Sequence, residues 1–313
     1  MQNVDKNGFF ENFDWKLYPK TEKFLKKNLS LFLSHNSFAK SLSKKLEEKT
    51  STRFFDWVDH ISLPSKKFPS SLLNELGFSE ENTFGVKVFR HRQSVFFPVL
   101  LNDNGFFEVC LKVENLSDFK KALSIKNSIE GKLFAPLRKL KVKKDKSYLL
   151  TAIERRGSNG FEVKDSGDLK EYSSALKTFL SRKRAFRTDK EGMIYTLQLI
   201  KKFLKSIDKS RLTDAFFRAE RVYWQKKNKA GQTQKARQDL LGLGWGNHDH
   251  HTYRSSRENF TKLIDIFESM GFVCRESFHA GEKAGWGAQI LEHPFCDIVI
   301  FADLDLTLQE KDT

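Results

Sequence analysis

The chain has 313 residues, of which 39% are hydrophobic and 13% aromatic, and this composition is typical of a globular protein and excludes a disordered one. Its 55 Lys and Arg exceed its 40 Asp and Glu, which gives a formal charge of +15 that suits an anionic partner. No segment reaches the ~20 apolar residues of a membrane-spanning helix, and the first residues contain no secretory signal, so we expect a cytoplasmic protein without a membrane partner.

The cysteines and the basic residues are both scattered along the chain. Cys110, Cys274 and Cys296 lie far apart with no CxxC spacing, which suits a reducing compartment and argues against a disulfide framework. The basic residues are mostly lysines mixed with acids, and only residues 138–146 and 182–187 form compact clusters. We predict that both clusters are solvated faces. The alternative is a basic rim that attracts an acidic small molecule or a phosphate backbone.

The first half of the chain changes from a helical to an extended pattern. Apolar residues recur at helical spacing over 22–48, which predicts one or two amphipathic helices. Beyond residue 53 we predict a strand that Pro64 ends and a short helix that Gly77 caps. A helix start is predicted near residue 115, and strands are predicted at 86–89, 94–101, 106–113, 137–142 and 148–154.

The second half begins with helices and ends with the clearest pattern in the chain. Three apolar stripes predict helices over 168–228. A strand ending near residue 255 then leads into a helix over 258–270 that Gly271 caps. Three further strands are predicted, at 272–278, 288–292 and 296–306, so the order of this segment is β-α-β-β-β.

Three of the eight histidines, His248, His250 and His251, lie within four positions. Side chains alternate along a strand, so His248 and His250 are expected on one face. Two imidazoles on one face can share a divalent metal, because neutral ring nitrogen is the commonest protein ligand. A solvated polar loop is the alternative.

A pattern of Asp-His on a strand, a helix and then Gly-Phe occurs twice. Asp59-His60 precedes a short helix and Leu76-Gly77-Phe78, and Asp249-His250 precedes a longer helix and Met270-Gly271-Phe272. Both copies resemble a module of the vicinal oxygen chelate superfamily, which includes glyoxalases and extradiol dioxygenases. The internal repeat strengthens this resemblance.

The resemblance implies an α+β fold in which paired βαβββ modules form a cupped mixed sheet that holds a metal. A helical N-terminal segment and a helical insert would accompany the modules. We accordingly expect a helical segment at 1–50, a first β-rich region at 51–165, the insert at 166–230 and the C-terminal module at 231–313.

The resemblance also implies the metal ligands. By position, His60 and His250 match the histidine ligands of the superfamily, and Glu108 in the sequence Asn-Gly-Phe-Phe-Glu matches a carboxylate ligand. The second carboxylate stays open between Glu292, Asp303 and Glu310. Such a site suits Fe(II), with Zn, Ni or Mn as alternatives, and implies a dioxygenase or lyase that acts on a small oxo or hydroxy acid.

Arg254 and His248 are predicted as catalytic residues. Arg254 is placed to pair with a substrate carboxylate, with a surface salt bridge as the alternative. His248 is placed to support a ligand or to act as an extra one. The other histidines are expected to be peripheral: His91 is anion-contacting or exposed, and His279 and His293 are polar surface residues.

Two other functions are compatible with the sequence. One is a non-catalytic binding or scaffold protein with the same fold. The other is a nucleic-acid-binding protein that uses the positive charge and the aromatic residues interleaved with arginine over 218–224. The glycines of residues 241–246 do not indicate a dinucleotide site, because a strand follows them where such a site requires a helix.

Overall fold

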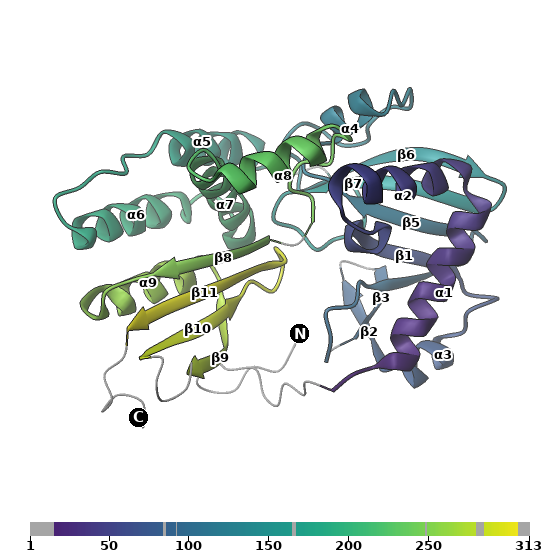
Figure 1. The fold of residues 1–313 in the computed structure, drawn as a ribbon, viewed down its shortest axis with the longest axis horizontal. Helices are drawn as coiled ribbons and strands as arrows, with labels where there is room; N and C mark the ends of the chain where they lie inside the picture. The colour runs from purple at the N-terminus through teal and green to yellow at the C-terminus, as the bar shows by residue number, and fades with distance from the viewer. Residues whose placement is uncertain are drawn as a thin grey trace.

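The fold is described by a computed structural model over residues 16–83, 86–91, 93–164, 167–247, 249–279 and 285–305. It combines helices with one large mixed sheet and one small sheet (Figure 1). The predicted α+β class is therefore confirmed. None of the helices within these residues is both long and apolar enough to cross a membrane.

The large sheet has seven strands in the order β2-β3-β4-β1-β5-β7-β6. β1 is parallel to β4 and β5 is parallel to β7, whereas the other neighbouring strands are antiparallel. The strands are β1 (Val58–Pro64), β2 (Phe78–Thr83), β3 (Val86–His91), β4 (Val99–Asn102), β5 (Phe107–Lys112), β6 (Leu137–Asp145) and β7 (Tyr148–Arg155).

The small sheet has four strands in the order β8-β11-β10-β9. β8 is parallel to β11, and the other two pairs are antiparallel. The elements are β8 (Asp249–Arg254), α9 (Arg257–Ser269), β9 (Val273–His279), β10 (Trp286–Glu292) and β11 (Ile298–Asp305). The β-α-β-β-β order predicted for the C-terminal segment is confirmed.

The first module, β1-α3-β2-β3-β4, has the same topology as the second, with α3 at Ser70–Glu75. In both modules the first strand pairs in parallel with the last, and the remaining pairs are antiparallel. The described strands nevertheless pair in two sheets and not in one shared sheet. β5, which we predicted as the end of the first module, instead pairs with the opposite edge of β1 and extends the sheet towards β7.

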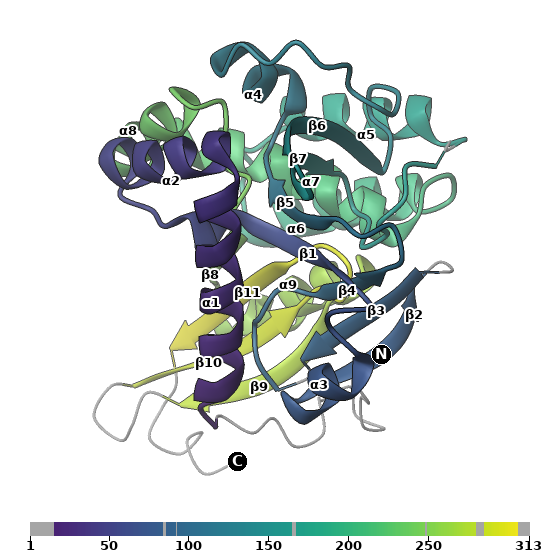
Figure 2. The same cartoon turned by 90° about the vertical axis from the view of Figure 1, so that its right-hand side faces the viewer.

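Helices α1 (Pro19–His35) and α2 (Ser37–Thr50) lie on the outer side of the large sheet (Figure 2). Phe32 of α1 and Ile61 of β1 are fully buried in the same hydrophobic core. The predicted helical stretch divides at Asn36, whose side chain accepts a hydrogen bond from a backbone N–H of α2 at 2.9 Å. This side chain caps α2 and turns the chain between the two helices.

The helices predicted as an insert pack against the small sheet. Phe217 lies 4.6 Å from the ring of His251 on β8 and 5.5 Å from the ring of Phe272. The second hydrophobic core therefore contains residues of the helices and of the small sheet together. These helices are α5 (Leu169–Ser181), α6 (Asp189–Phe203) and α7 (Lys209–Gln225).

The chain returns to the large sheet through α8 (Lys229–Asp239) and the glycine-rich segment 241–246. Leu243 is fully buried in the first core. A Cβ added to Gly242 or Gly246 would lie 2.5 Å from backbone atoms of residues 113–119, which follow β5 of the large sheet. The alternating glycines are therefore required by close backbone contact, and they hold the C-terminal half against the large sheet.

Candidate functional site

The two modules share a buried contact between a glycine and a histidine. Gly77 and Gly271 end the module helices with φ values of +87° and +100°. In each case the nearest atom to an added Cβ is the Nε2 of a histidine at the end of the third strand, at 2.6 Å for His91, the last residue of β3, and 3.1 Å for His293, which directly follows β10. Only glycine satisfies both the left-handed backbone and this close approach.

His91 and His293 are buried, with exposed fractions of 6% and 4%. Phe78 and Phe272, which follow the two glycines, contact these rings edge-on at 5.5 and 5.2 Å. Burial lowers the pKa of His91, and it lowers the pKa of His293 to about 4. Our prediction of anion-contacting or surface histidines at these positions was wrong, because both rings fill the space above the glycine.

The glycine–histidine contact allows the two modules to be aligned residue by residue. Arg90 precedes His91 as Glu292 precedes His293, so Arg90 and Glu292 are equivalent. In the second module Val299 pairs with His250 on one side and with Glu292 on the other. His250 and Glu292 therefore lie in one row across the small sheet.

This row faces away from α9. Ile298, Ile300 and Ala302 of β11 point into the core that contains α9, so Val299, His250 and Glu292 belong to the opposite face. Asp303 lies four residues further along β11 than Val299, which places it well away from His250 along the strand. Of the described candidates for the second carboxylate ligand, Glu292 is therefore the one that lies in the same row as His250.

His60 occupies the corresponding place in β1 and is held by its neighbour. The ring is 2% exposed, and its Nδ1 lies 2.6 Å from the carboxylate of Asp59. That carboxylate also accepts two hydrogen bonds from Arg155, at 2.6 and 2.8 Å. One buried aspartate thus fixes both a histidine and an arginine.

The protonation states follow from this geometry. Burial lowers the pKa of His60 although Asp59 opposes the shift, so the ring is neutral at pH 7. Burial alone would raise the pKa of Asp59, but Arg155 and His60 hold it well below its ordinary range. The Nδ1–H of His60 therefore donates to the carboxylate, and Nε2 carries the lone pair. Among the described residues, no side chain forms a hydrogen bond with that Nε2.

Glu108 lies on the same face of the large sheet as His60. β5 pairs with β1 so that Cys110 is opposite His60 and Glu108 is opposite Ser62. Glu108 accepts a hydrogen bond of 2.5 Å from the hydroxyl of Thr151. Burial raises the pKa of Cys110 well above its ordinary value, so this residue is a thiol and not a reactive thiolate.

The remaining predicted residues lie elsewhere. His250 is exposed on the small sheet. Arg254, at the end of β8, forms an exposed ion pair with Asp305, as the salt-bridge alternative predicted. His248 and Glu310 lie outside the described residues. Across the described ranges, no three His, Cys, Asp or Glu side chains are already gathered around one point as metal ligands would be.

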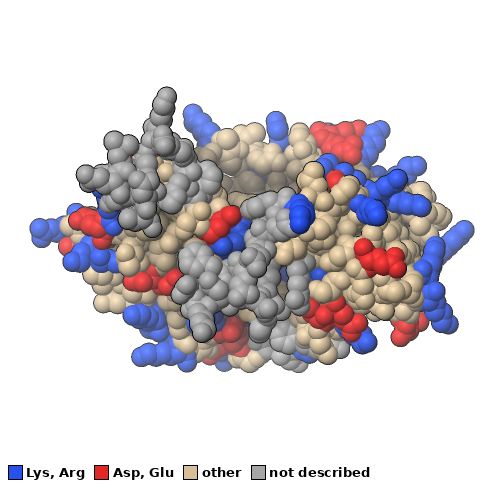
Figure 3. All heavy atoms as spheres, turned by 90° about the horizontal axis from the view of Figure 1, so that it is seen from below, with Lys and Arg blue, Asp and Glu red and all other residues tan. Residues whose placement is uncertain are grey.

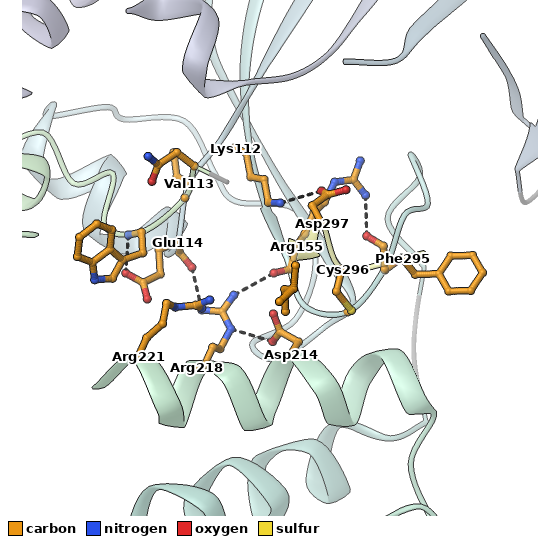
Figure 4. A pocket seen from close by; sticks show the side chains of 16 residues that line it. Lys112, Val113, Glu114, Arg155, Asp214, Arg218, Arg221, Phe295, Cys296 and Asp297 are labelled. Carbon is orange, nitrogen blue, oxygen red and sulfur yellow. Dashed lines mark hydrogen bonds and ion pairs between the residues drawn. The ribbon is translucent and has the colours of Figure 1, made fainter. Parts of the chain in front are cut away.

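A small cavity of about 40 Å³ lies between the ends of β5 and β7 of the large sheet, α7 and the start of β11 (Figure 4). The ammonium group of Lys112 on β5 lies 2.9 Å from the carboxylate of Asp297 before β11. Arg218 of α7 donates to Asp214 at 2.8 Å and to the backbone oxygen of Arg155 at 2.9 Å. Charged side chains from the large sheet, the second module and the helices thus meet beside the Asp59–Arg155 pair.

Most basic residues singled out in the sequence have structural partners. Residues 138–146 form the edge strand β6, where lysines hinder the addition of another strand. Arg182 pairs with the buried Glu220 at 2.7 Å. Arg218 is only 13% exposed at the junction, where it pairs with Asp214. Elsewhere cations and carboxylates are interspersed, as the face in Figure 3 shows.

Sequence reasoning missed Arg155 and the Lys112–Asp297 pair. Arg155 ends a strand in Glu-Arg-Arg-Gly, a run of charge inside an apolar pattern that signals buried partners.

No protein-family model matches this chain, and no curated protein is significantly similar to it.

Proposed function

We propose that this chain is a metal-dependent enzyme of the vicinal oxygen chelate type that acts on a small oxo or hydroxy acid. His60 of the first module and His250 and Glu292 of the second would hold the metal. The proposal rests on one observation above all: two modules of identical topology carry a histidine at the same place on the face opposite their helices.

The donor set suits a divalent metal. His60 is neutral, and its Nδ1 is anchored by a carboxylate, which is the arrangement that orients histidine ligands in metal sites. The carboxylate of Glu292 bonds Arg275 through Oε1, and a ligating carboxylate commonly keeps such a partner on one oxygen. Burial raises the pKa of Glu292, so metal binding would compete with a proton there.

A divalent metal in this position would supply Lewis-acid polarisation of two adjacent substrate oxygens and, if it is iron, chemistry with dioxygen. The chain itself contributes the rest. Asp59 fixes the tautomer of His60, and Phe161 covers that ring edge-on at 4.9 Å and limits the access of water. Lys112 and Arg155 line the junction cavity, where each already pairs with a carboxylate, that of Asp297 and that of Asp59.

Metal analysis of protein purified without a histidine tag tests this function. After anaerobic incubation with Fe(II), Zn, Ni or Mn and removal of free metal, we expect about one ion per chain. His60→Ala, His250→Ala and Glu292→Gln should each reduce that content severely. His35→Ala, at an exposed histidine of α1, is the matched control and should not.

Glu108→Gln distinguishes the two carboxylates. Retained metal in this variant, with loss in Glu292→Gln, supports a ligand set of His60, His250 and Glu292. The reverse result, with metal lost in Glu108→Gln and retained in Glu292→Gln, would identify Glu108 on β5 as the carboxylate ligand. If the unmodified protein takes up none of these metals, the enzyme proposal fails and a non-catalytic binding or scaffold protein becomes the better explanation.

A further inference from the structure

A second surface, which contains none of the proposed metal ligands, lies at the corner between α7 and α8. The chain carries six Lys or Arg and no Asp or Glu from Arg221 to Gln238. Lys226, Lys227 and Lys229 are exposed in this stretch, and so is Arg237 further along α8. One residue in three is therefore cationic here, against 55 of 313 in the whole chain, and no acidic residue interrupts the stretch.

Exposed aromatic surface accompanies these cations. Trp224 is 50% exposed at the end of α7, which is unusual for the largest apolar side chain. Its ring meets that of Tyr223 edge-on at 5.0 Å. The ammonium group of Lys227 lies 4.3 Å from the centre of the Tyr223 ring and 5.5 Å from that of Trp224.

A buried carboxylate holds this arrangement in place. Glu220 is 2% exposed and accepts a hydrogen bond of 3.3 Å from the indole N–H of Trp224. The same side chain binds Arg182 at 2.7 Å and Arg184 at 2.8 Å. Arg184 in turn stacks 4.0 Å above the ring of Tyr223. The indole and the guanidinium groups are therefore ordered before any partner binds.

We infer that this α7–α8 corner binds single-stranded nucleic acid. Its cations match a phosphate backbone, and an ordered, half-exposed indole offers a stacking surface for an unpaired base. An anionic membrane fits less well, because α8 has no apolar face to insert: its only apolar side chains are two alanines. An acidic peptide would use the cations but not the exposed ring.

Fluorescence anisotropy with a short labelled single-stranded oligonucleotide tests the inference. We expect binding that weakens steeply between about 50 and 200 mM salt. Trp224→Ala should weaken binding by about 5- to 100-fold, as the loss of one stacked base does, and Trp224→Phe should restore most of it. Retained affinity in Trp224→Ala would overturn stacking on this indole.

Charge-reversal variants test whether binding depends on the α7–α8 corner or only on the overall positive charge of the protein. Lys226→Glu with Lys227→Glu should abolish binding at the higher salt concentration. Lys66→Glu with Lys67→Glu changes the net charge equally at another exposed pair and should leave most binding intact. Equal losses in the two double variants, no binding at low salt, or a clear preference for anionic lipid vesicles would each overturn the proposal. Circular dichroism verifies that every variant is folded.

Discussion

The ammonium group of Lys112 lies 2.9 Å from the carboxylate of Asp297, and this ion pair joins the end of β5 to the turn before β11. It connects the large sheet directly to the second module, beside the cavity at their junction. Lys112 is the main reason that the pKa of Asp297 falls to about 2. The pair therefore makes the contact between the large sheet and the second module dependent on pH.

Asp297→Asn should remove a contribution to stability that depends on pH. The folded pKa lies below the unfolded value of about 3.9, so the contribution is complete above that value and is lost as the pH falls towards 2. Because the Asp297 side chain is 58% exposed, solvent screening limits the expected loss at pH 7 to about 1 kcal/mol. Urea unfolding of both proteins at pH 7 and pH 2.5 measures it, as a difference that should shrink at the lower pH. Asparagine also tolerates the positive φ of residue 297, so the backbone is not the cause.

Asp59→Asn should destabilise the protein by about 3–5 kcal/mol, because it leaves the buried Arg155 without its counter-charge. It should also weaken metal binding by about 10- to 100-fold, since His60 loses the group that orients it. Asp56→Asn breaks the exposed pair with Arg53 and is the control, with an expected cost of at most about 1 kcal/mol. Thermal unfolding and metal titration provide the two readouts. Equal stability of the two variants would contradict a structural role for the buried pair.

Gly77→Ala and Gly271→Ala should each lower the free energy of unfolding by about 2 kcal/mol or more. Alanine disfavours the positive φ at both positions, and its Cβ would clash with a histidine ring. Gly105→Ala has a comparable φ of +78° but no atom within 4 Å of the new Cβ, so it should cost only about 1 kcal/mol. Chemical denaturation measures the three values. In a double-mutant cycle, Gly271→Ala and His293→Ala should couple, since a smaller residue at 293 relieves the clash. Strict additivity would show that the ring is not the obstacle.

Gly246→Ala should loosen the attachment of the C-terminal half, because the new Cβ would lie 2.5 Å from the backbone of Val113. Limited proteolysis near residue 246 should become faster and the unfolding temperature should fall. Gly231→Ala within α8 has the opposite expectation. Its nearest atom would be 3.6 Å away, and alanine favours a helix, so we expect a gain of about 0.5–1 kcal/mol.

The C-terminal module was predictable because its pattern is local. Apolar periodicity of 3.6 and then of 2, with Gly271 between them, fixes a helix followed by strands whatever lies around them. The boundary at Asn36 was less certain, since an amphipathic pattern continues across it. Only the capping hydrogen bond of its side chain decides that two helices form.

The assignment of β5 and the positions of the histidines depend on tertiary contacts. The sequence predicts that a strand covers residues 106–113 but not which edge of β1 it joins, and this choice separates Glu108 from the module that we assigned it to. His91 and His293 resemble surface residues because their burial depends on a distant glycine. A signal was present: in both copies a charged residue and then a histidine follow the Gly-Phe pair on a later strand.

Leu241 and Leu243 complete the hydrophobic core that β1 and α1 begin. The N-terminal part of this protein therefore cannot finish folding on the ribosome until the segment around residue 243 has emerged. During synthesis, the apolar face of the early strands and helices remains incompletely covered over a long stretch of translation. Truncation before residue 241 should therefore yield an aggregating fragment rather than a stable domain, which light scattering of the expressed fragment would show.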